Sequence, residues 1–189
     1  NLAGMPEFLP LTTQARTVYI NEICRILGIE DFVPWIPEGE DVFGRWTLEN
    51  SPYFIDKNLT IPDDSTLTIE PGVQVVFQGY YFLLVHGTLI AEGTETDSIL
   101  FTVEDNTEFG DYNSELGGWQ GIFVENYGQM ENNDTTLLKH CIIEYAKGTS
   151  LSLQYSGGGI NIGNTGRVRI ENCIITGNAA EKAGGGLGC

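Results

Sequence analysis

The sequence predicts an all-β fold, a parallel β-helix in which short strands form coils that stack into a solenoid. Three observations lead to this prediction. Short runs of β-branched and aromatic residues alternate with turn residues from Trp46 onward. No helical pattern separates these runs, which argues against an alternating α/β sheet. Related segments recur at shifts of 27 and 32 residues, as expected for a repeat architecture.

The strand-like runs are short and are bounded by turn signals. In chain order the runs are Thr66–Ile69, Val73–Phe77, Phe82–Val85 and Ile99–Phe101. Proline, glycine and aspartate mark turns at 62–64, 70–72 and 92–94. We therefore expect three short strands in each coil, joined by tight corners, and no long strands of the kind found in β-sandwiches.

The repeats set the register between coils. Gly157–Ile160 recurs as Gly184–Leu187, Lys139–Ile143 is echoed by Glu171–Ile175, and Gly121–Val124 fits the slot of Gly159–Ile162. This alignment stacks Cys141, Ile142 and Ile143 on Cys173, Ile174 and Ile175, at the ~4.8 Å spacing of neighbouring parallel strands. Asn172 and Asn178 are expected at coil corners, because asparagine tolerates the left-handed conformation.

About four coils are expected, over residues 53–78, 79–106, 118–148 and 157–180, with a further one opening at Gly184. Two polar insertions, 105–115 and 129–135, interrupt the series. Trp119 is expected to fill the interior of a coil or its corner. A coil cannot bury its apolar face alone, so stacking of the coils supplies the core.

Residues 1–45 differ from the rest and are predicted to form a separate segment, with the solenoid over 46–189. Leu11–Leu27 has the only helical pattern, with Tyr19, Ile20, Ile23, Cys24 and Leu27 on one face. Gly28 suits the end of this helix. The segment is expected either to cap the open end of the solenoid or to dock on another chain, and the sequence leaves both alternatives open.

Several motifs together resemble the secreted bacterial right-handed parallel β-helix repeat proteins. They are 66–73 (TLTIEPGV), 85–94 (VHGTLIAEGT), 99–102 (ILFT), 118–122 (GWQGI), 141–145 (CIIEY) and 170–179 (IENCIITGNA). The last of these, with Gly184–Leu187, is also similar to the repeats of chlamydial polymorphic outer-membrane proteins. The resemblance implies right-handed coils and an exported, cell-surface location. It implies no chemistry. Such solenoids usually have more coils, so we expect either a piece of a longer protein or end-to-end association.

Charge and composition exclude two classes of partner. Nine basic against 26 acidic residues give a net charge of −17, which disfavours binding to nucleic-acid phosphates. No apolar run reaches the ~18 residues that a membrane-spanning helix needs. The four cysteines, at positions 24, 141, 173 and 189, match no zinc-binding spacing, and their pairing cannot be read from the sequence.

Candidate carbohydrate-binding residues lie on predicted strand faces and near loops. Arg167 and Arg169 share one strand face, with Lys139 and His140 expected one coil away, and Tyr127 and Tyr155 can stack on sugars. A hydrolase needs two carboxyl groups ~5–9.5 Å apart. Glu125, Glu144 and Glu171 are the outward-facing candidates, but their coil positions do not obviously coincide.

Calcium is the one cofactor that the sequence suggests. Asp105, Glu108, Asp111 and Glu115 crowd a single insertion, and hard oxygen ligands of this kind can hold Ca²⁺. No EF-hand or nonapeptide calcium repeat is present, so a plain solvated acidic loop is the competing interpretation.

These observations predict a non-catalytic, extracellular or cell-surface structural protein. It would act in adhesion or self-assembly, with surface glycans or its own copies as partners and loops presented from a stiff rod. A filament subunit is one form of this hypothesis. The alternative is a polysaccharide lyase or glycoside hydrolase on the same scaffold, since fold alone does not determine function.

Overall fold

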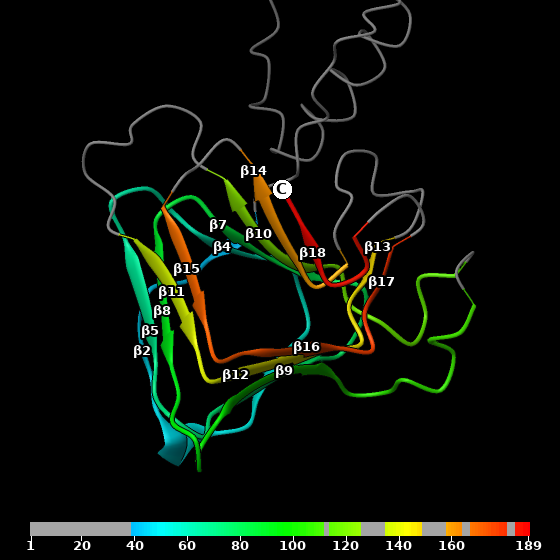
Figure 1. Cartoon of the computed structure of the whole chain (residues 1–189), viewed down its shortest axis with the longest axis horizontal. Coiled ribbons are helices and arrows are strands. Elements are labelled where there is room, and N and C mark those ends of the chain that lie inside the picture. Colours follow the sequence, from blue (N-terminus) through cyan, green and yellow to red (C-terminus); the bar gives the residue numbers. More distant parts are fainter. Residues whose placement is uncertain (1–38, 112–113, 126–134, 149–157, 164–166, 181–183) are drawn as a thin grey trace, which may run out of the picture. The chain divides into compact units, whose positions relative to one another are not determined.

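The computed structural model describes residues 39–111, 114–125, 135–148, 158–163, 167–180 and 184–189 (Figure 1). All strand pairs within these ranges are parallel, and they form three large sheets and one small one. The one helical element in the described ranges is the 3₁₀ turn η1 (Leu48–Asn50). The chain is therefore all-β there, as the sequence predicts.

The first sheet has six strands in the order β1 (Glu40–Asp41), β4 (Leu59–Ile61), β7 (Phe82–Val85), β10 (Gly121–Glu125), β14 (Ile160–Gly163) and β18 (Leu187–Gly188). The second has five, β15 (Val168–Glu171), β11 (Thr136–Lys139), β8 (Thr88–Glu92), β5 (Thr66–Ile69) and β2 (Gly44–Trp46). The third also has five, β16 (Ile174–Thr176), β12 (Cys141–Glu144), β9 (Ile99–Val103), β6 (Gln74–Phe77) and β3 (Tyr53–Ile55). A fourth, smaller sheet pairs β13 (Lys147–Gly148) with β17 (Ala179–Ala180).

The order of the strands gives a solenoid-like arrangement. Each complete pass of the chain places one strand in the first sheet, one in the second and one in the third, and the next pass lies alongside. We call one such pass a row. Figure 1 shows the three sheets as three walls around a common interior, with the first sheet at the top. The arrangement is consistent with a parallel β-helix.

The interior is filled by apolar side chains that stack from row to row. Ile61 pairs with Val85, and Val85 with Val124, and all three belong to the core. Trp119 is fully buried, and its ring stacks on Phe77 at 4.2 Å between centroids. Burial of such rings contributes much of the stability of a small fold. Trp119 thus fills the interior, which is one of the two placements that the sequence predicts.

The predicted strands and registers are largely confirmed. The runs at 66–69, 73–77, 82–85 and 99–101 match β5, β6, β7 and β9 within two residues. Ile142 and Ile143 pair with Ile174 and Ile175, and Ile160 pairs with Leu187. Asn172 adopts φ of 51°, the left-handed corner that its residue type favours.

Asn178 also bonds across rows. Its side chain accepts a hydrogen bond from the Ala146 N–H at 2.8 Å and donates one to the Ile143 carbonyl at 2.8 Å. The amide therefore ties its own row to the backbone of the row before it.

The solenoid begins earlier than the predicted boundary at residue 46. β1 pairs with β4, and β2 pairs with β5, so residues 40–46 already belong to the stacked sheets. β1 is not predicted, because Glu40 and Asp41 are both exposed acids and carry no alternation of apolar and polar side chains. The predicted helix over 11–27, Cys24 and most of the insertion 129–135 lie outside the described residues.

Candidate functional site

Lys147 is the most unusual side chain of the described fold. It is fully buried, although lysine is among the residues least often found inside proteins. Its position is fixed by β13, which pairs with β17, and by a 2.6 Å hydrogen bond from its N–H to the Trp119 carbonyl. A buried ammonium group needs several acceptors to compensate for lost hydration.

Four backbone carbonyls of one loop supply these acceptors. Nζ of Lys147 donates to the carbonyls of Glu108 (3.2 Å), Asp111 (2.9 Å), Ser114 (3.2 Å) and Leu116 (2.7 Å). Nζ also lies 5.4 Å from the centre of the Phe109 ring, a cation–π contact. One cation therefore holds the polar segment 104–118, which we call the anchored loop.

The ammonium group titrates under opposing influences. Burial lowers the pKa of Lys147, while the negative charges of Asp111 and Glu108 oppose the shift. The loop carbonyls are turned toward Nζ in the way that carbonyls of a cation-binding loop turn toward a metal ion. The ammonium group of Lys147 thus takes the place that a bound metal cation has in cation-binding loops.

Glycines close the anchored loop onto the solenoid. Gly117 has φ of +76°, and a Cβ there would lie 2.3 Å from the Phe109 backbone nitrogen. At Gly118 a Cβ would lie 2.9 Å from Cβ of Lys147. Both positions therefore need glycine for the loop to approach the lysine.

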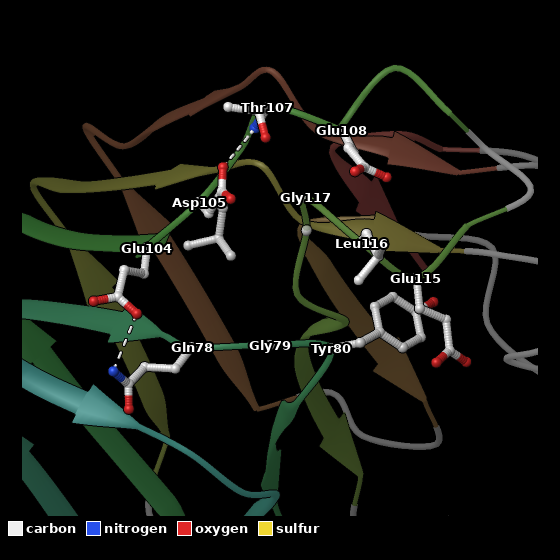
Figure 2. A pocket seen from close by; sticks show the side chains of 12 residues that line it. Gln78, Gly79, Tyr80, Glu104, Asp105, Thr107, Glu108, Glu115, Leu116 and Gly117 are labelled. Atoms are coloured by element: carbon white, nitrogen blue, oxygen red, sulfur yellow. Dashed lines mark hydrogen bonds between the residues drawn. The ribbon is translucent and has the colours of Figure 1, made fainter.

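A hollow of about 380 Å³ lies between the anchored loop and the corner after β6. Its lining includes the acids Glu104, Asp105, Glu108 and Glu115, the ring of Tyr80 and the exposed side chain of Leu116 (Figure 2). Among the described residues, no lysine, arginine or histidine lines it. The hollow is therefore negatively charged with an aromatic side, a lining suited to neutral polyols or cations and unsuited to uronates.

Hydrogen bonds fix several groups of this lining. The Tyr80 hydroxyl donates to the Lys147 carbonyl at 2.9 Å, and Gln120 Nε2 donates to the Tyr80 carbonyl at 2.9 Å. Gln78 Nε2 donates to Glu104 Oε2 at 3.1 Å, as drawn in Figure 2. Asp105 accepts from the Thr107 N–H at 3.0 Å, and hydrogen bonds from Thr107 lower the pKa of Asp105. The lining is thus organised before any ligand binds.

The four predicted calcium ligands belong to this loop but do not converge. Asp105 caps Thr107, and Glu108 and Asp111 turn their carbonyls toward Lys147. Within the described ranges no three His, Cys, Asp or Glu side chains gather closely enough to hold a metal ion. Calcium binding stays a prediction, and the positions of these carboxylates add no support to it.

The predicted basic residues lie elsewhere. Arg169 is on β15 in the second sheet and forms an ion pair with Glu171. Lys139 is in the neighbouring row, and its Nζ lies 2.7 Å from Glu92 Oε1. That contact raises the pKa of Lys139. Arg167 comes just before β15, and neither arginine lines the hollow. Tyr127 and Tyr155 lie outside the described residues.

The three candidate catalytic carboxylates are separated by the fold. Glu125 ends β10 of the first sheet, Glu144 ends β12 of the third, and Glu171 ends β15 of the second. Glu144 accepts a 3.0 Å hydrogen bond from Thr102. Glu125 is buried, and its Oε1 has no hydrogen-bond partner within the part of the chain that the structure describes. These three acids do not form a pair on one sheet.

Lys147 is the functional residue that sequence reasoning missed. The signal was weak: a lysine two positions after a tyrosine, in a region with no other lysine after Lys139 until Lys182.

Comparisons with protein-family models, with curated proteins and with solved structures found no match. In the described part of the chain, no helix has both the length and the apolar character required to cross a membrane.

Proposed function

We propose that this chain is a non-catalytic structural protein of the cell surface or extracellular space that presents the anchored loop and its hollow to glycans. The observation that carries the proposal is the binding of four loop carbonyls by Lys147. A loop fixed in this way keeps its shape without a ligand, which lowers the entropic cost of binding one.

The scaffold proposed is a right-handed parallel β-helix of about four or more coils. Parallel strands joined by crossovers are right-handed in almost all known cases, which supports this handedness. The three large sheets, with five or six strands each in the described ranges, provide a stiff support. For residues 1–38, which lie outside the described residues, we propose a cap or docking role through the predicted helix.

The proposed ligand is a neutral or amino sugar at the end of a surface glycan. Carboxylates accept hydrogen bonds from sugar hydroxyls, amides both accept and donate them, and an aromatic ring supplies an apolar face. Glu104, Glu115 and Tyr80 would supply these groups here. Acidic polysaccharides are disfavoured, because the described lining has four carboxylates and no basic side chain.

The test is binding of the whole chain to immobilised neutral, amino-sugar and uronate glycans. We expect neutral or amino sugars to bind and uronates to fail. The double variant Glu104→Gln/Glu115→Gln should weaken binding at least about tenfold. The variant Glu95→Gln, at an exposed acid away from the hollow, is the matched control and should bind as the parent does. Shortened glycans in the reaction mixture would overturn the non-catalytic assignment in favour of the carbohydrate-active enzyme.

Self-assembly is the other form of the proposal. Light scattering of the full chain over a wide concentration range, with and without calcium, measures whether its mass grows beyond 20.8 kDa. If the predicted helix docks on another copy, the variant Ile20→Glu/Ile23→Glu should abolish that growth. A constant monomer mass together with no glycan binding would contradict both forms.

A further inference from the structure

Two cysteines occupy equivalent positions in neighbouring rows. Ile142 pairs with Ile174, so Cys141 and Cys173, one residue earlier, stand side by side in the same register. Each follows a corner residue in the left-handed conformation, His140 with φ of 47° and Asn172 with φ of 51°. The backbone therefore presents both side chains in the same way, toward the core that Cys141 joins and Cys173 contacts.

The sulfur atoms have matching surroundings. Sγ of Cys141 lies 3.4 Å from the carbonyls of Lys139 and Ala91. Sγ of Cys173 lies 3.3 Å from the carbonyl of Glu171 and 3.4 Å from that of Leu138. Lys139 pairs with Glu171, and Ala91 with Leu138, so each contact of one thiol is the other's contact moved by one row.

The two thiols differ in exposure and in protonation. Cys141 is 1% exposed, whereas Cys173 is half-buried. A hydrogen bond from Cys141 lowers the pKa of Cys173 to about 6, and the same contact together with burial raises that of Cys141. Burial of Cys173 opposes this shift and favours the thiol form, but the bond from Cys141 is the larger influence. The less buried of the two cysteines is thus the one whose thiol has the lower pKa.

The charged side chains near the two thiols do not cancel the difference between their pKa values. Two residues before each thiol a charged side chain is already paired, Lys139 with Glu92 and Glu171 with Arg169. From the third sheet, Ile99 is the register partner of Cys141 and is fully buried.

The spacing of the two positions suits a cross-link that reverses easily. Neighbouring parallel strands lie ~4.8 Å apart, within the range of Cα separations that disulfides span. Stacked Cβ atoms at that spacing are slightly farther apart than the ~3.8 Å average of a relaxed disulfide. A link here would close the rows slightly and store strain, and strained disulfides are the more readily reduced ones.

We propose that Cys141 and Cys173 form a thiol–disulfide exchange site, in which Cys173 attacks and Cys141 resolves. The oxidant is a small-molecule disulfide. The Cys173 thiolate attacks one of its sulfurs, forming a mixed disulfide and releasing one thiolate. Cys141 then loses its proton and attacks Sγ of Cys173, which forms the Cys141–Cys173 bond and releases the second thiolate. Two protein thiols are oxidised, and one small disulfide is reduced to two thiols.

The test uses the full chain with Cys24→Ser and Cys189→Ser, so that no other thiol competes. Oxidised glutathione is added, free thiols are blocked, and proteolytic peptides are weighed by mass spectrometry. We expect a peptide that joins Cys141 to Cys173 and disappears on reduction. Alkylation of Cys173 before oxidation should have its midpoint near pH 6, against ~8.5 for an ordinary thiol. A glutathione adduct on Cys173 that never resolves, or no reaction, would overturn the proposal.

Matched variants separate the two roles. Cys141→Ala should raise the alkylation midpoint of Cys173 by about one pH unit or more and leave the glutathione adduct unresolved. Cys141→Ser retains a hydrogen-bond donor, so its midpoint should stay below that of Cys141→Ala. Cys173→Ser leaves only the buried Cys141, which should react at least about tenfold more slowly. Equal midpoints in the Ala and Ser variants, or a fast-reacting Cys141, would contradict these assignments, and circular dichroism verifies that each variant is folded.

Discussion

The stacked rows and the anchored loop are held together in opposite ways. In the rows, many apolar side chains share the burial, and each lies against its equivalents in neighbouring rows. In the loop, four carbonyls depend on the single ammonium group of Lys147. The comparison teaches that a repeat fold can accommodate a polar insertion of fixed shape when one row supplies a side chain that binds the insertion. We therefore expect a substitution in a row to destabilise the neighbouring rows as well, and a substitution in the loop to destabilise only the loop.

Trp119 is where the two regions meet, and its loss should have the largest effect. Its ring stacks on Phe77, and its Nε1 donates to the Glu144 carbonyl at 2.8 Å. Trp119→Ala is expected to lower the free energy of unfolding by about 3–5 kcal/mol. Trp119→Phe keeps the stacking but leaves the carbonyl without its donor, and should cost about 1–3 kcal/mol.

Urea unfolding followed by circular dichroism measures both variants. Trp46→Ala is the matched control, because Trp46 stacks on Tyr53 at 4.6 Å but is only partly buried. A loss as large at Trp46 as at Trp119 would show that burial at the junction is not what matters.

Position within the stack is tested by two register partners. Ile143 is fully buried, whereas Ile175, one row later, is partly exposed, and its strand β16 has a neighbour on one side only in the described ranges. Ile143→Ala should cost about 2–5 kcal/mol. Ile175→Ala should cost less than half as much, because fewer contacts are lost. Equal losses in urea unfolding would mean that stability does not depend on neighbours in this solenoid.

Lys147 tests whether the loop depends on one group. Lys147→Met keeps the length of the side chain and removes the ammonium group, so the loop carbonyls lose their donor. We expect a loss of about 1–3 kcal/mol, felt mainly inside the loop. Hydrogen exchange should therefore rise in peptides from 104–118, while those from β5 and β8 keep their protection.

Lys139→Met is the control for the loss of a lysine charge. Its pair with Glu92 is partly exposed, and exposed ion pairs contribute about 0–1 kcal/mol. If Lys147→Met deprotects the rows as much as the loop, the division into two regions is wrong.

The sequence predicted the rows better than the loop, for a physical reason. Row positions repeat, so the pattern around Ile143 predicts Ile175 as its stacking partner, and their side chains need only be apolar to fit the core. β1 was missed because Glu40 and Asp41 carry no apolar signal, although their backbone pairs with β4. Lys147 was missed because its partners are carbonyls, and a backbone acceptor leaves no trace in residue types. The four acids of the insertion attracted a calcium hypothesis, whereas the cation in this loop is a side chain.

The smallest effect is expected at Asp105, because its hydrogen bonds organise only one turn at the start of the loop. Hydrogen bonds from Thr107 lower its pKa, so the folded state favours the charged carboxylate. A lowered pKa contributes stability above the unfolded value of about 3.9, and this is lost as pH falls through the lower folded value. Asp105→Asn should therefore speed hydrogen exchange near Thr107 slightly at pH 7, and the difference from the parent should shrink below pH 4. Glu95→Gln removes an equally exposed charge and should change nothing there. If Asp105→Asn still speeds exchange by the same amount at low pH, then the shape of the Asp105 side chain, and not its charge, stabilises this turn of the loop.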